Sequence, residues 1–238
     1  MSLPIFYIDQ LNENASLITL NEETSKHVVQ VLRMQAGEQI HLTDGRGHLL
    51  TAQIAEAHKR NCVVKVQGII YQEKGKGKTT IAISLVKNAS RFEWFLEKAT
   101  ELGVNEIVPL LCERTERQHF RYERMKGILL SAMLQSKQVW LPVLSEPVKF
   151  EEYVRQTTSL EKMVKLIAHC EDAEKQQLSN LQIAEFSNSI ILIGPEGDFT
   201  PKEIELALQQ HFLPVALGET RLRTETAGIA AAVLLSVR

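Results

Sequence analysis

The stretch IGPEGDFT, residues 193–200, follows a predicted buried strand at residues 189–193 and leads into a helix. Thr200, Pro201 and Glu203 fit the N-cap, the first helical position and the N3 carboxylate of that helix. The two glycines of the stretch allow the backbone to adopt positive φ and to approach a ligand closely. Ligands of open α/β sheets bind at the carboxyl ends of strands, where this loop lies. The stretch therefore indicates a binding loop, and a tight strand–helix turn is the alternative.

A second loop, LGETRLRTETA at residues 217–227, connects a predicted strand at 213–217 to a closing helix at 226–237. The loop carries Arg221 and Arg223 together with carboxylates and threonines. These groups lie beside a helix N-terminus, which stabilises an anionic group or a carbonyl. A structural turn needs fewer polar groups, so the loop is predicted to be functional.

Strands and helices alternate from residue 79 onward, which is the signature of an α/β layer fold. A capping box of Ser90 and Glu93 predicts the start of the first of these helices. The closing helix is apolar nearly all round, which predicts burial within the fold or in a subunit interface. The expected strands cover residues 80–86, 106–111, 163–168, 189–193 and 213–217, and the expected helices cover 91–102, 122–135, 151–156, a segment after 200, and 226–237.

Residues 1–72 are predicted to form a separate β-rich unit, and the glycine-rich residues 73–78 a linker. Short β-type runs cover residues 5–8, 16–20, 39–42 and 62–66, residues 44–47 (DGRG) are a hairpin-turn signal, and 22–32 is an expected helical insert. Gly77-Lys78-Thr79 resembles part of a P-loop. A strand follows it, however, whereas a P-loop must open a helix, so this interpretation is rejected.

Composition limits the classes of function. The 238 residues are 44 % hydrophobic and 24 % charged, with no apolar run that would span a bilayer and no recognisable signal peptide. The three cysteines, odd in number and without a CxxC pair, argue against a disulfide framework or a zinc site and fit a cytoplasmic protein. Residues 169–172 (HCED) lack metal-ligand spacing, so no metal is expected.

The formal net charge of −2 argues against non-specific coating of nucleic acid. Any RNA contact must therefore come from local patches. Residues 114–126 (RTERQHFRYERMK) combine five basic residues with aromatic ones, which suits phosphates and stacked bases. Lys74, Lys76 and Lys78 could add phosphate contacts. The alternative for residues 114–126 is a solvated helix entry with ordinary ion pairs.

The two loops together resemble the SPOUT superfamily of knotted methyltransferases, and specifically the RsmE type, the 16S ribosomal RNA uridine N3-methyltransferases. The resemblance covers the whole chain. It extends to HVVQVLRMQAG at 27–37, KNASRFEWFLEKATELGVNEIVP at 87–109, Glu113-Arg114 and Leu134-Gln135-Ser136. It implies a C-terminal SPOUT domain at 79–238 with a mostly parallel sheet and a trefoil knot, which is an exception among folds. It also implies an N-terminal PUA-like small β-barrel at 1–72 that docks RNA.

The resemblance further implies the cofactor S-adenosylmethionine (SAM), a homodimer with its active site at the interface, and 16S rRNA, within an assembled small subunit, as the partner. No membrane or metal is implied. The expected cofactor-binding residues are Ala168, Ile193, Gly194, Pro195, Glu196, Gly197, Leu217, Gly218, Leu222, Arg223, Thr224, Thr226 and Ala227. The expected RNA-binding residues are Arg33, Arg91, Arg114, Arg117, Arg121 and Lys137.

This sequence departs from the family pattern in three places. The first strand carries no arginine, Asp198 stands where a second glycine is usual, and only Lys137 represents the basic residue expected after Gln135-Ser136. These departures affect the details of RNA contact more than cofactor binding.

The implied reaction puts a methyl group on N3 of uridine, which lies on the Watson–Crick edge, so the target must be unpaired or extruded. Arg221 or Arg223 would donate to the flanking carbonyl oxygens, and Glu225 is a candidate general base. Two alternatives stay open. One is methylation of another RNA nucleotide, at a ribose 2′-OH or another base. The other is a non-catalytic RNA-binding factor in ribosome assembly.

Overall fold

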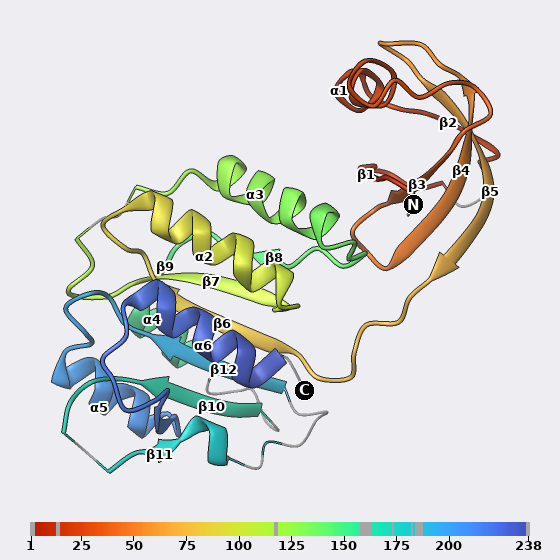
Figure 1. The fold of residues 1–238 in the computed structure, drawn as a ribbon. Helices are drawn as coiled ribbons and strands as arrows, with labels where there is room; N and C mark the ends of the chain where they lie inside the picture. The colour runs from red at the N-terminus through yellow and green to blue at the C-terminus, as the bar shows by residue number, and fades with distance from the viewer. Residues whose placement is uncertain are drawn as a thin grey trace. The chain divides into compact units, whose positions relative to one another are not determined.

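The computed structural model of the chain describes residues 3–12, 15–116, 119–157, 163–172, 174–181, 183 and 188–236. The chain divides into two units, coloured along the sequence in Figure 1. Unit 1 comprises Met1–Lys74 and Met133–Leu141, and unit 2 comprises Gly75–Ala132 and Pro142–Arg238. Residues 133–141, which the sequence analysis assigned to the C-terminal domain, thus belong to unit 1.

Unit 1 is built on a curved five-stranded sheet in the order β1-β3-β4-β5-β2 (Figure 1). Its strands are β1 (Ile5–Tyr7), β2 (Leu17–Thr19), β3 (Gln39–Thr43), β4 (His48–Glu56) and β5 (Val63–Tyr71). β1 pairs parallel with β3, and the other neighbours are antiparallel. Alternate residues of β3 and β4, such as Ile40, Leu42 and Leu50, are fully buried, so one face of the sheet forms the core.

The hairpin turn predicted at residues 44–47 is confirmed between β3 and β4. Asp44 Oδ1 accepts hydrogen bonds from the backbone N–H groups of Arg46 (2.8 Å) and His48 (3.4 Å). Gly45 and Gly47 have φ of 68° and 100°, where a Cβ would be strained. The predicted helical insert begins as α1 (Glu22–Lys26) and continues as a π-helical turn at His27–Val31.

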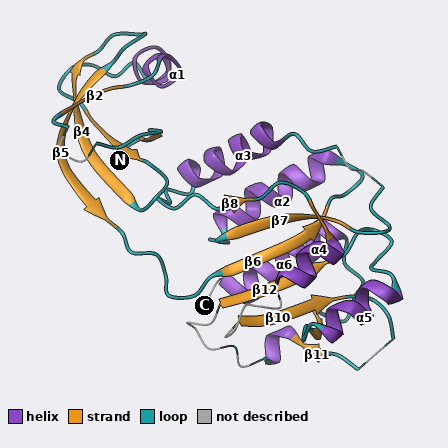
Figure 2. Cartoon of the chain, turned by 180° about the vertical axis from the view of Figure 1, so that it is seen from behind, coloured by secondary structure: helices purple, strands orange, loops and turns teal. Residues whose placement is uncertain are grey.

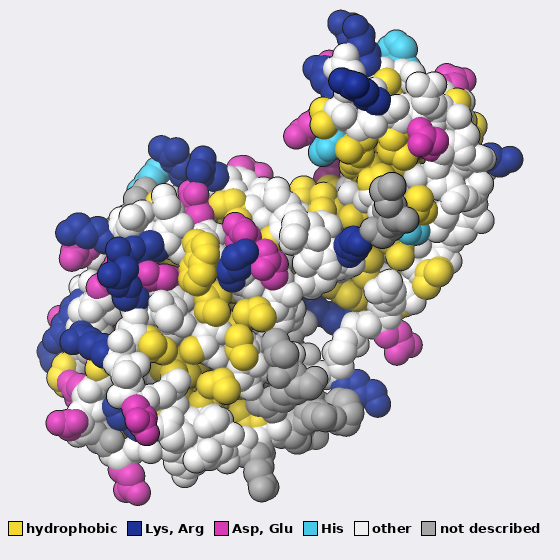
Figure 3. Space-filling model, viewed as in Figure 1, with side chains coloured by type: hydrophobic (Ala, Val, Ile, Leu, Met, Phe, Trp, Pro, Cys, Tyr) yellow, Lys and Arg dark blue, Asp and Glu magenta, His cyan; other side chains and the backbone are white. Residues whose placement is uncertain are grey.

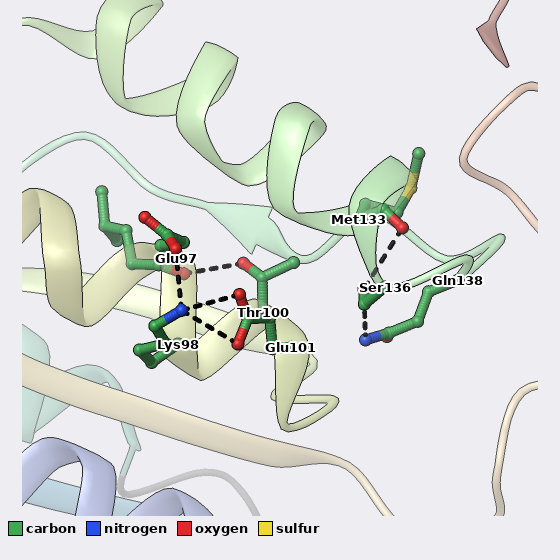
Figure 4. Close-up of polar contacts among 8 residues, drawn as sticks. Glu97, Lys98, Thr100, Glu101, Met133, Ser136 and Gln138 are labelled. Carbon is green, nitrogen blue, oxygen red and sulfur yellow. Dashed lines mark hydrogen bonds and ion pairs between the residues drawn. The ribbon is translucent and has the colours of Figure 1, made fainter. Parts of the chain in front are cut away.

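Residues 133–141 form a strap that completes unit 1. The Val139 carbonyl accepts from Gly47 N, and Leu141 N donates to the Gly45 carbonyl, both at 2.9 Å. A Cβ on Gly47 would come within 2.5 Å of the Trp140 ring, so only glycine allows this approach. Within the strap, Gln138 Nε2 donates to Ser136 Oγ at 3.0 Å (Figure 4).

Unit 2 is built on a sheet whose described strand pairs are all parallel, in the order β11-β13-β10-β12-β6-β7-β8, with β9 beside β7. The predicted α/β layer fold is therefore confirmed. The strands are β6 (Thr79–Ser84), β7 (Glu106–Leu111), β8 (Val143–Leu144), β9 (Val148–Lys149), β10 (Met163–Ala168), β11 (Gln176–Gln177), β12 (Asn188–Ile193) and β13 (Leu213–Ala216).

The helices of unit 2 cover both faces of this sheet (Figures 1 and 2). α2 (Ala89–Glu101) and α6 (Thr224–Ser236) pack against each other on one face. α4 (Phe150–Gln156) and α5 (Pro201–Gln209) share a core cluster with residues of the other face. α3 (Tyr122–Gln135) leads into the strap, and a short 3-10 helix covers Leu178–Asn180. None of the described helices is long and apolar enough to cross a membrane.

The structure corrects the predicted start of α2. Its N-cap is Asn88, whose side chain accepts from Ser90 N at 2.9 Å, so Ser90 is not the cap. Glu93 instead pairs with both Arg124 Nε (2.6 Å) and Nη2 (2.9 Å). Farther along α2, Lys98 Nζ contacts Glu97 and Glu101 (Figure 4). The capping box of Thr200 and Glu203 at α5 is confirmed.

α6 begins at Thr224, two residues before its predicted start, and only part of its surface is buried within the chain. Gly228, Ala231, Ala232 and Leu235 are buried, whereas Val233 is 42 % exposed. A Cβ on Gly228 would lie 2.6 Å from the Phe95 ring and 2.9 Å from Ile83 Cδ1. The close approach of α6 to α2 and β6 therefore requires a glycine at this position.

We predict that Gly228→Ala destabilises unit 2 by about 1–3 kcal/mol, because the added methyl group overpacks the contact with Phe95. Urea denaturation measures the free energy of unfolding. Gly127→Ala is the matched control, since Gly127 lies in α3 and a Cβ added there would have nothing within 4 Å. This control should be neutral or stabilising by up to about 1 kcal/mol. Equal stability of Gly228→Ala and the parent would contradict the packing.

Candidate functional site

Two adjoining cavities lie at the carboxyl ends of β10, β12 and β13, which meet at one edge of the sheet because the strands are parallel. Their volumes are about 280 and 380 Å³. Both cavities are lined in part by the same residues, Ala168, Cys170, Arg221, Leu222 and Ala227. The two loops singled out in the sequence thus supply walls of one continuous region.

Most of the expected cofactor residues line these cavities. In addition to the shared Ala168, Leu222 and Ala227, the first cavity is lined by Ile193, Gly194, Pro195, Glu196, Arg223 and Thr224. The second is lined by Leu217 and Gly218. Gly197 and Thr226 line neither cavity.

Asp198 explains both a departure from the family pattern and the shape of the first loop. Its φ is 63°, a left-handed conformation that glycine adopts readily and aspartate tolerates. Its Oδ2 accepts a hydrogen bond from Cys170 N at 2.8 Å, and its own N–H donates to the Pro195 carbonyl at 3.0 Å. Asp198 therefore ties the loop after β12 to the loop after β10, which a glycine could not do.

Glu113 and Arg114, which follow β7, form hydrogen bonds that hold the same loop and the start of α5 in place. Arg114 Nη1 donates to the carbonyls of Gly197 (2.7 Å) and Phe199 (3.4 Å). Glu113 N donates to Glu203 Oε1 at 2.9 Å. Arg114 was predicted to bind RNA, and the structure places at least one of its guanidinium donors on the loop backbone.

His169 is a residue of the second cavity that the sequence analysis missed. The residue is buried, and its Nδ1 has no hydrogen-bond partner among the described residues. Burial lowers the pKa of this imidazole, and the nearby Lys175 lowers it further. Lys175 Nζ also donates to the His169 carbonyl at 2.9 Å, which fixes the backbone here. His169 thus contributes to the cavity wall, while its unpartnered Nδ1 is shielded from solvent.

The second loop is joined to the first by one buried hydrogen bond, from Thr224 Oγ1 to the Gly194 carbonyl at 2.9 Å. Arg221 and Arg223 are exposed at the cavities. Glu225 is different, because its carboxylate is buried and lines neither cavity. Glu225 Oε1 lies 3.7 Å from Arg91 Nε.

The basic stretch at 114–126 is partly engaged within the fold. Arg124 is paired with Glu93, and Phe120 packs edge-on against Phe92 and Tyr122. Arg121 Nε lies 3.5 Å from His119 Nε2. The ion pair of Arg124 is of the kind that the solvated-helix alternative expects, and RNA binding by this stretch stays a prediction. Arg117 lies outside the described residues.

Two other predicted RNA-binding residues belong to unit 1. Arg33 and Lys137 have φ of 56° and 57°, so each holds a basic side chain where glycine would be less strained. Among the described residues there is no group of three or more His, Cys, Asp or Glu that could hold a metal ion.

Comparison with known proteins identifies the family of this chain. The model of the RNA methyltransferase domain matches residues 73–236, and that of the RNA methyltransferase PUA domain matches residues 20–67. The ribosomal RNA small subunit methyltransferase E of Synechocystis is 33 % identical, covering 88 % of this chain and 69 % of the relative. The chain belongs to the family of ribosomal RNA small subunit methyltransferases E.

Solved structures of related methyltransferases match nearly the whole chain. A probable rRNA-methyltransferase from Porphyromonas gingivalis has a TM-score of 0.90 and 38 % identity, covering 99 % of both chains. The ribosomal RNA small subunit methyltransferase E of Neisseria gonorrhoeae, bound to S-adenosyl methionine, has a TM-score of 0.87 and 27 % identity, covering 99 % of this chain and 98 % of that one. The resemblance seen in the sequence and the predicted fold class are thereby confirmed.

The cysteines give a chemical test of the site. Cys170 is exposed at both cavities, whereas Cys62 and Cys112 are buried. Burial raises the pKa of the Cys62 thiol and raises that of Cys112 to about 12, so both remain protonated and unreactive at neutral pH. We predict that iodoacetamide labels Cys170 alone in the native protein, as read by peptide mass spectrometry. All three should react in urea, and native labelling of Cys112 would contradict the structure.

Proposed function

We propose that this protein transfers a methyl group from S-adenosylmethionine to N3 of a uridine in the 16S ribosomal RNA of the small subunit. The observation that carries the proposal is the pair of adjoining cavities, walled by the two loops that mark the family. Membership of the small-subunit methyltransferase E family supports the class of reaction. The position on the base rests on the resemblance to the uridine N3-methyltransferases.

The cavities suit S-adenosylmethionine in size and chemistry. Ligand pockets are commonly about 300–1,000 Å³, and the two volumes fall near this range. Ile193, Leu222 and Ala227 offer apolar surface to an adenine ring. When bound, the cofactor supplies an activated methyl group for in-line displacement.

The residues of the protein would then orient the nucleotide and stabilise its charge. The N3 edge of uridine is accessible only in an unpaired or extruded base. The exposed guanidinium groups of Arg221 and Arg223 border the first cavity and would donate to the carbonyl oxygens that flank N3. Orientation of the base against the methyl donor supplies much of the rate. Methyl transfer of this kind requires no metal.

We propose a homodimer, with the active site at its interface, and a C-terminal trefoil knot. Hydrophobic side chains gather over α2 and α6 on the face shown in Figure 3. Trp94 on α2 is 43 % exposed, and Val233 on α6 is 42 % exposed. An apolar face of this kind is typical of a surface covered by another chain.

The assembled small subunit is the expected substrate, and the cytoplasm the expected location.

The test of the proposed function is nucleoside mass spectrometry of 16S rRNA. Small subunits from cells that lack the gene are treated with the purified protein and S-adenosylmethionine, and we expect one added 3-methyluridine. Gly194→Trp is the inactive control, because a Cβ on Gly194 already meets Phe199 N at 3.2 Å and an indole would fill the first cavity. Calorimetry should show that this variant no longer binds the cofactor.

Other outcomes of this experiment are informative. A methylated ribose or another methylated base would overturn the N3 assignment and keep the methyltransferase. Absence of both cofactor binding and methylation would favour a non-catalytic RNA-binding factor.

We predict that Val233→Glu converts a dimer into a monomer, because it buries a charge without a partner in the proposed interface. Sedimentation velocity measures the change. Leu208→Glu on α5 is a matched control at a similarly exposed position away from α2 and α6, and it should leave the dimer intact. A monomeric parent protein would refute the proposed assembly.

A further inference from the structure

Glu225 is a buried carboxylate with an incomplete set of hydrogen bonds. Its side chain is only 8 % exposed, in the first turn of α6. Oε2 has no hydrogen-bond partner among the described residues. Oε1 faces Arg91 Nε at 3.7 Å, which is close enough for charge attraction but too long for a hydrogen bond. A buried carboxylate left in this state is costly, so a further donor to Oε2 would stabilise it.

Arg91 is the cation that faces this carboxylate, and it is suited to a second contact. It lies in the first turn of α2, and its side chain is 41 % exposed. A guanidinium has five N–H donors in a planar fork, so one edge can pair with a carboxylate while others bind an anionic oxygen of a ligand. Arg91 thus contacts the buried carboxylate of Glu225 on one side and solvent on the other.

The segment that precedes α2 is also held to the cofactor loop. Lys87 N donates to Glu196 Oε1 at 3.0 Å, and Glu196 lines the first cavity. Thr224, which precedes Glu225 in the chain, lines the same cavity. Arg91 does not line the cavity itself; its link to the cavity is through Glu225, which follows the cavity residue Thr224.

A general base must come within hydrogen-bond reach of the proton that it removes. The carboxylate of Glu225 lines neither cavity and is turned toward Arg91. The geometry is therefore unfavourable for the role of general base that the sequence suggested.

We propose that Glu225 is a positioning residue that holds the Arg91 guanidinium near the first cavity, where Arg91 binds an anionic oxygen of the RNA next to the target nucleotide. A short shift of the guanidinium toward the carboxylate would give Oε2 its missing donor in a two-bond, fork-like pair, while another edge of the guanidinium binds the RNA. This inference rests on the proposed function only in taking RNA as the substrate. It removes Glu225 from proton transfer.

The test compares Glu225→Gln, Arg91→Ala and the double variant. Each single change should raise the KM for RNA about tenfold or more, with kcat reduced by less than about threefold. The double variant should be no worse than Arg91→Ala alone, because both changes remove the same contact. The pH profile of kcat should keep its shape in Glu225→Gln, and the Kd for S-adenosylmethionine should be unchanged in all three.

Two controls keep the outcome interpretable. Arg155→Ala removes an exposed, ion-paired arginine of α4 that lines neither cavity, and it should not alter the KM for RNA. Arg91→Lys keeps the charge but loses the planar fork, so its KM should lie between those of the parent and Arg91→Ala. If Glu225→Gln fails to fold, as judged by its thermal unfolding, the two Arg91 variants still decide whether Arg91 contacts RNA.

Several results would overturn the proposal. A fall in kcat of about a hundredfold or more in Glu225→Gln, with loss of the acidic limb of the pH profile, would identify Glu225 as the base. An unchanged KM in Arg91→Ala would remove Arg91 from the RNA contact. If the parent methylates a different nucleotide, the proposed N3 function fails, but the same comparison on that RNA still tests Arg91. If no RNA is methylated, dissociation constants for RNA replace KM.

Discussion

The site depends on two loops being held together above the ends of β10, β12 and β13, and within the described part of the chain a buried hydrogen bond joins them directly. Thr224 donates its hydroxyl hydrogen to the carbonyl of Gly194, thirty residues earlier in the chain. Because the bond is buried, losing it would leave the carbonyl without a partner, which costs more than an exposed bond would. The same bond fixes the start of α6, which then packs on α2 and β6 through Gly228. The hydrogen bond that joins the two cavity loops therefore also sets where α6 begins to pack on α2 and β6.

Local patterns in the sequence predicted the elements well where one signal dominated. Thr200, Pro201 and Glu203 specified a helix start without a competitor, and the structure agrees. At α2 two capping residues lie two positions apart, and Asn88 took the position that Ser90 was expected to fill. Glu93, which would complete a capping box with Ser90, is instead paired with Arg124 from α3. The N-cap preferences of the residues near the start of a helix contain no information about such a partner in another helix.

The parts of the site that the sequence did not reveal depend on contacts between distant residues. His169 lies in a four-residue run that had no ligand spacing, and its unpartnered nitrogen becomes visible only when the cavity wall is assembled. Asp198 had a signal, because it replaces an expected glycine. The sequence analysis connected this departure with the details of RNA contact, whereas the structure shows a left-handed aspartate whose side chain accepts a hydrogen bond from Cys170 N in the cavity wall. For Glu225 the residue type suggested proton transfer, and only burial and orientation suggested positioning.

The strap at residues 133–141 has a consequence for the order in which the protein acquires its structure. During synthesis the strands of unit 1 leave the ribosome long before Val139, Trp140 and Leu141, which close the hairpin turn at Gly45 and Gly47. The N-terminal half of a growing chain usually folds first. Here that half must wait with an open side until the middle of the chain has been translated. The strap thus makes completion of the first unit dependent on progress into the second, and an aborted nascent chain remains incomplete in both.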